Sequence, residues 1–162
     1  MNIRQYAIKN CDDFYTLSCL ESSCKDTDEL IVINQRLVEI GEEIVLEMDD
    51  EIFDDPDFCH DIDLYAAPMD NLAVLFLEKR EYAKAVPLLE RALQLYRIQE
   101  EFDSPLYLWQ RYYALKRLVQ CYTELGNKTM ANICRYEQVL LERKYKMLTH
   151  DDASEETQDA VK

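Results

Sequence analysis

Few residues of this chain could do chemistry, and their spacing does not favour it. The two histidines, His60 and His150, lie far apart, and neither has a nucleophile at a spacing that indicates a catalytic pair. Cys59 stands next to His60, but no C-x-x-C pair accompanies them, so structural zinc is disfavoured. The 2 glycines cannot form a phosphate-binding glycine loop. We therefore expect no enzyme activity, no cofactor and no metal.

Carboxylates are the most concentrated chemical group, with 33 acidic residues against 18 basic ones and a net charge of −15. From Glu47 to Asp70 there are ten acidic residues and no Lys or Arg. A calcium loop would need a turn glycine and a bidentate glutamate at its twelfth position, and this segment provides neither. We interpret residues 49–63 as a solvated acidic loop.

The acidic charge also narrows the range of partners and settings. Nucleic-acid phosphates and anionic lipid head groups select for clustered positive charge, so we expect neither a nucleic acid nor a membrane as partner. No apolar run is long enough for a membrane span or a secretory signal, which predicts a cytoplasmic protein. In that setting the 6 cysteines are expected to be reduced thiols.

Length and composition predict one folded all-α domain. The chain has 162 residues, of which 48% are hydrophobic and 31% charged, the profile of a packed protein. Its 2 glycines and 4 prolines are too few for the many tight turns of an all-β fold. We place the domain at residues 1–148 and expect a disordered acidic tail at residues 149–162.

Apolar residues at three- and four-residue spacing predict helices along most of the domain. Residues 11–48 are interpreted as a degenerate helical pair, weakly periodic at first and strongly periodic after a cap at Thr27 or Asp28. Gly41 interrupts the strong stripe, which predicts that another helix approaches closely there.

The helical pattern sharpens after the acidic segment. Pro68 and Asp70 suit a first helical turn, although the pattern leaves open whether helix continues before Pro68. Two or three residues after this helix, a second helix begins near Glu81. So short a link forces an antiparallel hairpin. Another pair begins at Pro105, with Gly126 as the left-handed end of its first helix, so clear repeats cover residues 60–148. The stripe of the last helix comprises Met130, Ile133, Cys134, Leu140, Leu141 and Tyr145.

The stretch from Asn71 to Phe76, followed by Tyr82 and then by Ala85 and Ala92, resembles a tetratricopeptide repeat. Its Asn-Leu-Ala opening is similar to the repeats of kinesin light chains. The resemblance implies an alpha-alpha superhelix, a helical-hairpin array with about two clear repeats and a degenerate pair before them. In such an array Ala73, Ala85 and Ala92 are small because neighbouring helices touch there.

The second repeat matches the pattern more loosely than the first. Corresponding positions Ala73 and Val119 lie 46 residues apart, against a usual period of about 34 residues. Arg135 and Gln138 occupy positions that are apolar or small in the first repeat, so the last helix can act as a solubilising cap. We expect Trp109 and its neighbouring tyrosines to pack between helices.

Helical-hairpin repeats line a concave surface with the first helix of each pair, and that surface generally takes up a peptide. By the resemblance, the binding positions are Asn71, Val74, Leu77, Tyr113, Lys116, Arg117 and Gln120. Asn71 can bond a peptide backbone, and Lys116 and Arg117 can meet an acidic ligand. Alternatively, Val74 and Leu77 pack against the leading helices, and the two cations face water or pair with the acidic loop of the chain itself.

The sequence therefore predicts a protein-interaction module, an adaptor or scaffold that binds an acidic or amphipathic partner peptide. An assembly or secretion chaperone of the same fold, which masks a hydrophobic segment of one client, is the alternative. A homo-oligomer stays open, because a short array leaves an apolar end that a second copy can cover.

Overall fold

The computed structural model describes residues 3–47, 56–98 and 105–159, with side chains over residues 3–46, 64–97 and 108–146. Every regular element in these ranges is a helix, which confirms the all-α prediction for the part of the chain described. The helices are α1 (Ile3–Lys9), α2 (Phe14–Ser23), α3 (Thr27–Glu47), α4 (Pro56–Glu78), α5 (Tyr82–Ile98), α6 (Pro105–Glu124) and α7 (Lys128–Asp159).

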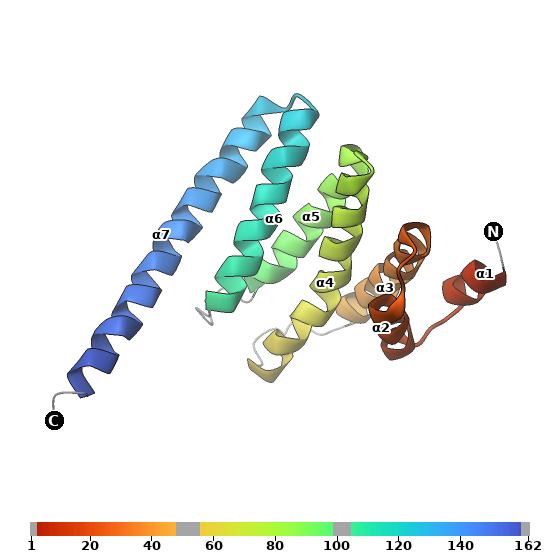
Figure 1. Ribbon diagram of the computed structural model, residues 1–162, viewed down its shortest axis with the longest axis horizontal. Coiled ribbons are helices and arrows are strands. Elements are labelled where there is room, and N and C mark those ends of the chain that lie inside the picture. Colours follow the sequence, from red (N-terminus) through yellow and green to blue (C-terminus); the bar gives the residue numbers. More distant parts are fainter. Residues whose placement is uncertain (1–2, 48–55, 99–104, 160–162) are drawn as a thin grey trace.

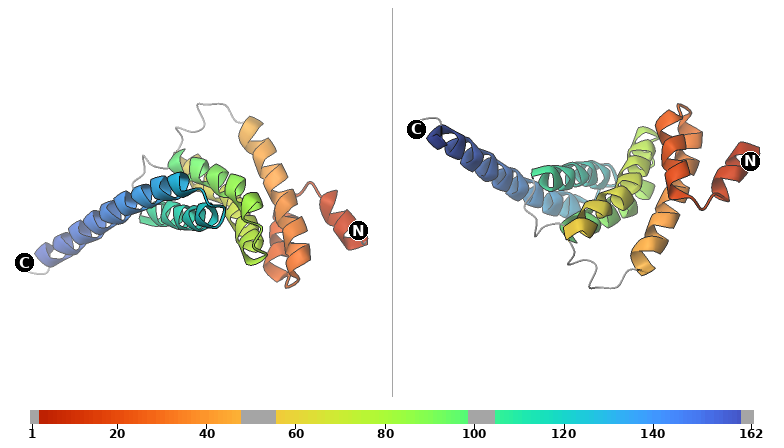
Figure 2. Two further views of the ribbon diagram at one scale, coloured as in Figure 1. Left: turned by 90° about the horizontal axis from the view of Figure 1, so that it is seen from above. Right: turned by 90° about the horizontal axis from the view of Figure 1, so that it is seen from below.

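The helices form a row that follows their order in the chain (Figure 1). Each helix from α2 to α6 packs against the next one, and α1 packs against α3. Short links at residues 24–26, 79–81 and 125–127 join α2 to α3, α4 to α5 and α6 to α7 as three helical hairpins. The two termini lie at opposite ends of the row, and α7 extends well beyond α6 (Figure 2).

The links of the second and third hairpins have the same backbone geometry. Arg80 and Gly126, 46 residues apart, both have a left-handed conformation, with φ of 59° and 75°. In both links the amide N–H of that residue donates a hydrogen bond to the carbonyl oxygen three positions earlier, with N···O distances of 3.0 and 3.1 Å. The amide N–H of the next residue donates a hydrogen bond to the carbonyl oxygen five positions before it, with an N···O distance of 2.8 Å in both links. This pair of bonds is the Schellman motif, so the left-handed helix end predicted at Gly126 is confirmed.

Side-chain caps explain where the first two hairpin helices begin. The Asp13 carboxylate accepts a hydrogen bond from the Tyr15 amide at 3.1 Å and caps α2. At the start of α3 the Asp26 carboxylate accepts from the Glu29 amide at 2.8 Å. The cap of this helix is therefore Asp26 and not Thr27 or Asp28, because only Asp26 precedes the first helical residue.

The core confirms the predicted close approaches between helices. Ala73, Ala85 and Ala92 are fully buried within the larger apolar cluster, which extends from α3 to α7. A methyl group on Gly41 would lie 3.4 Å from the ring of Tyr65 in α4. A smaller cluster joins α1, α2 and α3 and consists of Ile8, Leu17, Ile33, Leu37 and Ile40.

Two predicted boundaries are wrong. Residues 56–63 of the expected acidic loop belong to α4, because Pro56 suits a first helical position and the aspartate after it favours the helix N-terminus. Pro68 consequently lies inside α4 and does not open it. The expected tail is helical as far as Asp159, since no glycine or proline follows Gly126 to end α7. Residues 49–55 and 160–162 lie outside the described residues.

Candidate partner-binding groove

An open groove of about 570 Å³ crosses all three hairpins. Its walls come from α2, α3, α4 and α6, so elements far apart in the sequence meet there. The lining residues are Glu21, Ser22, Cys24, Leu30, Asn34, Asn71, Val74, Leu75 and Arg117.

Asn71 joins the middle hairpin to the leading one at this groove. Its Nδ2 donates a hydrogen bond to Oε1 of Glu21 at 2.9 Å. The Asn71 side chain is exposed, and its amide oxygen makes no hydrogen bond within the described residues. Val74, one turn further along α4, is half-buried and adds an apolar surface to the wall. The groove therefore offers a hydrogen-bond acceptor beside an apolar contact.

Asn34 of α3 contributes a buried amide side chain to the groove lining. Its side chain is 1% exposed, and its Nδ2 donates to the Leu30 carbonyl at 3.0 Å. Its Oδ1 is buried and has no hydrogen-bond partner among the described residues. An unpaired buried carbonyl costs about 1–3 kcal/mol, so this oxygen is a local source of instability at the groove.

Arg117 is held by an acid of the chain itself. Its Nη1 lies 2.6 Å from Oδ2 of Asp70, and both side chains are largely buried. Burial raises the pKa of the Asp70 carboxyl, and the charge of Arg117 opposes that rise. The other oxygen of Asp70 is buried with no hydrogen-bond partner in the described part of the chain. Asp70 therefore offsets much of the positive charge that Arg117 was predicted to offer an acidic ligand.

The exposed side of α6 combines aromatic rings with cations. Lys116 Nζ lies 5.8 Å from the centre of the Tyr113 ring, and the Arg117 guanidinium carbon lies 5.9 Å from it. These distances suit cation–π contacts. Lys116 is exposed and forms no ion pair with any acid among the described residues. The free charge at this end of the groove is therefore that of Lys116.

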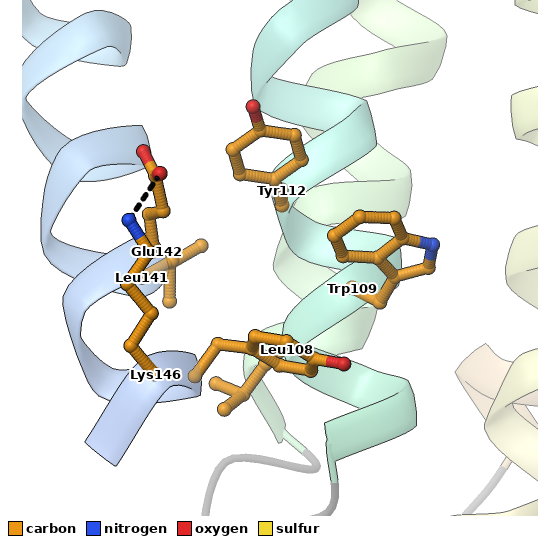
Figure 3. Close-up of a pocket in the computed structure, with 7 residues that line it drawn as sticks. Leu108, Trp109, Tyr112, Leu141, Glu142 and Lys146 are labelled. Carbon is orange, nitrogen blue, oxygen red and sulfur yellow. Dashed lines mark hydrogen bonds and ion pairs between the residues drawn. The ribbon is translucent and has the colours of Figure 1, made fainter. Parts of the chain in front are cut away.

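A second hollow, of about 250 Å³, lies between α6 and α7 (Figure 3). Leu108 and Leu141 contribute to its lining, Trp109 and Tyr112 stand on the α6 side, and Lys146 pairs with Glu142 on α7 at 2.9 Å. The lining is mainly apolar.

The prediction that Trp109 packs between helices is wrong in part. Its side chain is 45% exposed, and its ring stacks on Tyr112 with the centroids 5.5 Å apart. Leu108 takes the buried position because one residue along a helix turns the side chain by about 100°. Trp109 consequently faces the rim of the hollow.

The structure brings three of the seven predicted binding positions together in the groove. Asn71, Val74 and Arg117 line it, whereas Tyr113, whose ring lies near Arg117 and Lys116, and Lys116 itself are not part of the lining. Leu77 does not line the groove, because its half-buried side chain packs against the larger core cluster. Gln120 is exposed on α6 and is not part of the lining.

Sequence reasoning missed the contribution of the leading hairpin. Asn34 follows Leu30 by four residues, so it falls on the apolar stripe of α3, and a polar residue at such a position was a usable signal. Glu21 lies in the weakly periodic segment, where the sequence pattern contains no comparable signal.

Other kinds of site find no support in the described residues. No group of three or more His, Cys, Asp or Glu side chains there could hold a metal ion. The cysteines that the structure describes are free thiols, namely Cys11, Cys19, Cys24, Cys121 and Cys134. Within the same residues, none of the helices is long and apolar enough to cross a bilayer.

We compared the chain with family models, characterised proteins and solved structures. None of them matches it.

Proposed function

We propose that the three hairpins form a short array of the tetratricopeptide-repeat type, an alpha-alpha superhelix with α2 and α3 as its degenerate leading pair. Support comes from the two identical Schellman links, which lie 46 residues apart, and from the fully buried Ala73, Ala85 and Ala92. From α2 to α7, each helix packs on its neighbour in the chain, which is the pattern of repeat arrays.

In this proposal the protein is a non-enzymatic adaptor or scaffold in the cytoplasm that holds a partner's peptide in the groove. The observation that carries it is the exposed amide oxygen of Asn71, which makes no hydrogen bond among the described residues and lies on a groove wall with the apolar Val74. An extended peptide offers amide donors along its backbone and side chains for an apolar wall. The chemistry needs neither a metal nor a cofactor.

The expected partner is a peptide with an apolar side chain at Val74 and an acidic residue near Lys116. Arg117 contributes less to the recognition of acids, because Asp70 already accepts its hydrogen bond at 2.6 Å. Nucleic acids and membranes are not among the partners we propose, since the chain carries a net charge of −15.

The test is quantitative co-purification with two matched variants. Val74→Arg places a long cation in the groove, whereas Ala83→Arg places the same side chain on an exposed site of α5. We expect partners recovered with the wild type and with Ala83→Arg to fall about tenfold with Val74→Arg, a loss of about 1.4 kcal/mol of binding free energy. Equal recovery with both variants would refute a role for the groove.

The alternative, a chaperone that masks one client's hydrophobic segment, is supported by the apolar hollow of Figure 3. A chaperone would co-purify with a single stoichiometric client in high salt, because apolar burial is not screened. Trp109→Asp would release such a client, and Val74→Arg would leave it bound. The adaptor predicts the opposite response to these two substitutions.

A further inference from the structure

Helices α5 and α7 occupy equivalent positions in their hairpins, and yet their exposed faces differ. The offset of 46 residues that relates the two links also relates Tyr82 and Lys128, the first residues of the two helices. Exposed positions on one face of α5 are Pro87, Glu90 and Gln94. The equivalent positions of α7 are Ile133, Tyr136 and Leu140. Two of the three exposed positions in α5 are polar, whereas all three equivalent positions in α7 carry large apolar or aromatic side chains.

The side chains at these α7 positions are exposed to solvent. Ile133 is 53% exposed, Tyr136 69% and Leu140 43%, and Val139 beside them is 44% exposed. Tyr136, Val139 and Leu140 lie on the side of α7 away from the buried Cys134, whereas Ile133 lies at the edge of this group and lines a hollow with Cys134 and residues of α5 and α6. We call Ile133, Tyr136, Val139 and Leu140 the α7 stripe. A contiguous group of large apolar side chains on one helix face marks an interaction site.

The exposure of Tyr136, Val139 and Leu140 shows that most of the stripe is uncovered among the described residues, while Ile133 at its edge lines a hollow with residues of α5 and α6. This helix is the last in the row, and Figures 1 and 2 show no other drawn helix beyond it. In α5 the same helix surface is bordered on both sides, by α4 and by α6. The stripe is therefore available to another molecule.

Positive charge borders the stripe. Arg135 and Arg143 are exposed, and neither pairs with an acid among the described residues. Arg135 donates only to neutral oxygens, those of Asn132 and Thr123. The acids of α7 in the same region are already engaged, because Glu137 pairs with Arg97 and Glu142 with Lys146. The surface around the stripe thus combines apolar contacts with free guanidinium groups, in a chain that is strongly acidic elsewhere.

We propose that the α7 stripe binds an amphipathic helix of another protein, with carboxylates along the edge of its apolar face. The apolar residues of such a helix would pack on Tyr136 and Leu140, and its acids would pair with Arg135 and Arg143. Tyrosine and arginine are the residues that most often dominate binding free energy at interfaces. The guanidinium groups favour a carboxylate partner geometrically as well as by charge.

A second copy of this chain fits the surface less well. Two stripes packed face to face would bring the arginines of both copies together, and like charges repel. The acid-rich α3 exposes Glu39 and Glu43, but its one large exposed apolar residue in the described range is Leu46. Such a face lacks the apolar row that the stripe would bury.

The test uses a synthetic probe and matched variants of the full chain. The probe is a fluorescent 18-residue peptide with leucines on one helical face and glutamates along both edges. A second peptide has the same composition in scrambled order, and a third has lysines in place of the glutamates. Fluorescence anisotropy measures the affinity of each peptide for the wild type, at low and at moderate salt.

Two substitutions probe the stripe, and two equally exposed ones serve as controls. Tyr136→Ser and Arg143→Glu alter the stripe and its border, whereas Tyr15→Ser and Lys25→Glu alter α2 and the link after it. We expect saturable binding of the acidic peptide alone, weakened about tenfold by each stripe variant and unchanged in each control. Raising the salt should weaken binding, since part of it is ionic.

Several outcomes would overturn the proposal. If the lysine or scrambled peptide bound as tightly as the acidic one, carboxylates would not determine the affinity. If both stripe variants bound the acidic peptide with unchanged affinity, the peptide would bind elsewhere on the protein. A dimer in sedimentation that Tyr136→Ser abolishes would assign the stripe to a second copy. Adsorption to anionic phosphatidylglycerol vesicles without peptide binding would assign it to a lipid surface. Because no residue of α7 lines the groove, these results are independent of the proposed peptide site.

Discussion

The middle hairpin, α4 with α5, and the last hairpin, α6 with α7, share their link geometry but differ in what surrounds their second helix. In α5, which α4 and α6 cover, Leu89 and Ala92 are fully buried. In α7, which lies at the end of the row, the equivalent positions are Arg135, which is exposed, and Gln138, which is half-buried. The comparison teaches that the neighbours of a helix, and not its place in a repeat, decide which of its faces must be apolar.

The first helices of the two hairpins, α4 and α6, differ in charge at equivalent positions. Position 70 in α4 is an aspartate, and the equivalent position in α6 is Lys116. The next position is Asn71 in α4 and Arg117 in α6, so the groove face of α6 is the more basic one. The ion pair between Asp70 and Arg117 joins the two hairpins across this difference.

The largest expected contrast is in the loss of stability when the equivalent residues Leu89 of α5 and Arg135 of α7 are truncated to alanine. Leu89→Ala should lower the free energy of unfolding by about 3 kcal/mol, because it leaves a cavity in a fully buried site. Arg135→Ala should change it by less than about 0.5 kcal/mol, since the side chain is exposed. Urea denaturation followed by circular dichroism measures both. Similar losses in the two variants would show that α7 is covered in solution as α5 is.

A smaller effect is expected at the two hairpin links. Gly126→Arg should destabilise the protein by about 1 kcal/mol, because the left-handed conformation is strained for a residue with a Cβ atom. Nothing lies within 4 Å of the added Cβ, so strain alone is tested. Arg80→Gly, the reverse exchange in the other link, should stabilise by about 0.5 kcal/mol. Thermal melts measure both variants. A lower melting temperature for Gly126→Arg and a higher one for Arg80→Gly would support equivalent links, and changes of the same sign would contradict them.

Asp70, which pairs with Arg117 of the groove lining, should make the stability of the protein depend on pH. Burial raises the pKa of Asp70 above its usual 3.8. The folded chain therefore binds this proton more readily than the unfolded chain, and stability falls as the pH rises from 3.8 through the folded pKa. Asp70→Asn removes this titration and the ion pair with Arg117, so the difference in stability between variant and wild type should shift toward the variant as the pH rises from about 4 to about 7. Urea denaturation at both pH values tests this, and a constant difference would contradict it.

The smallest effect on stability is expected at the equivalent position in α6. Lys116→Glu should change the free energy of unfolding by less than about 0.5 kcal/mol, because the side chain is exposed and lacks an ion pair. It should nevertheless weaken an acidic partner in the groove, which co-purification measures. A marked loss of stability would show that Lys116 has a structural role that Asp70 does not share.

Much of this architecture could be predicted from the sequence, because the middle and last hairpins have strong stripes. Ala73, Ala85 and Ala92 are buried as expected, and Gly126 ends α6 as expected. The start of α4 was missed because the acidic residues after Pro56 favoured a loop, although acids also stabilise a helix N-terminus.

The exposed and paired residues were harder to predict. The apolar residues of α7 fall on two faces, and only packing against α6 decides that Cys134 and Leu141 are buried while Ile133 and Leu140 are exposed. The pairing of Arg117 with Asp70 joins residues 47 positions apart, and local spacing contains no signal for such a contact. The resemblance could place Asn71 and Arg117 on first helices, but it could not show which acids of the chain engage them.

The order of packing along the row has a consequence for how the chain acquires its structure. Because the main helix contacts join elements adjacent in the chain, or α1 with α3, little loop-closure entropy opposes their formation. Assembly can begin in any one hairpin and spread to both sides, as in other linear arrays. Amide hydrogens should then exchange slowest in α4, α5 and α6, which have partners on both sides, and fastest in α1, which packs mainly on α3.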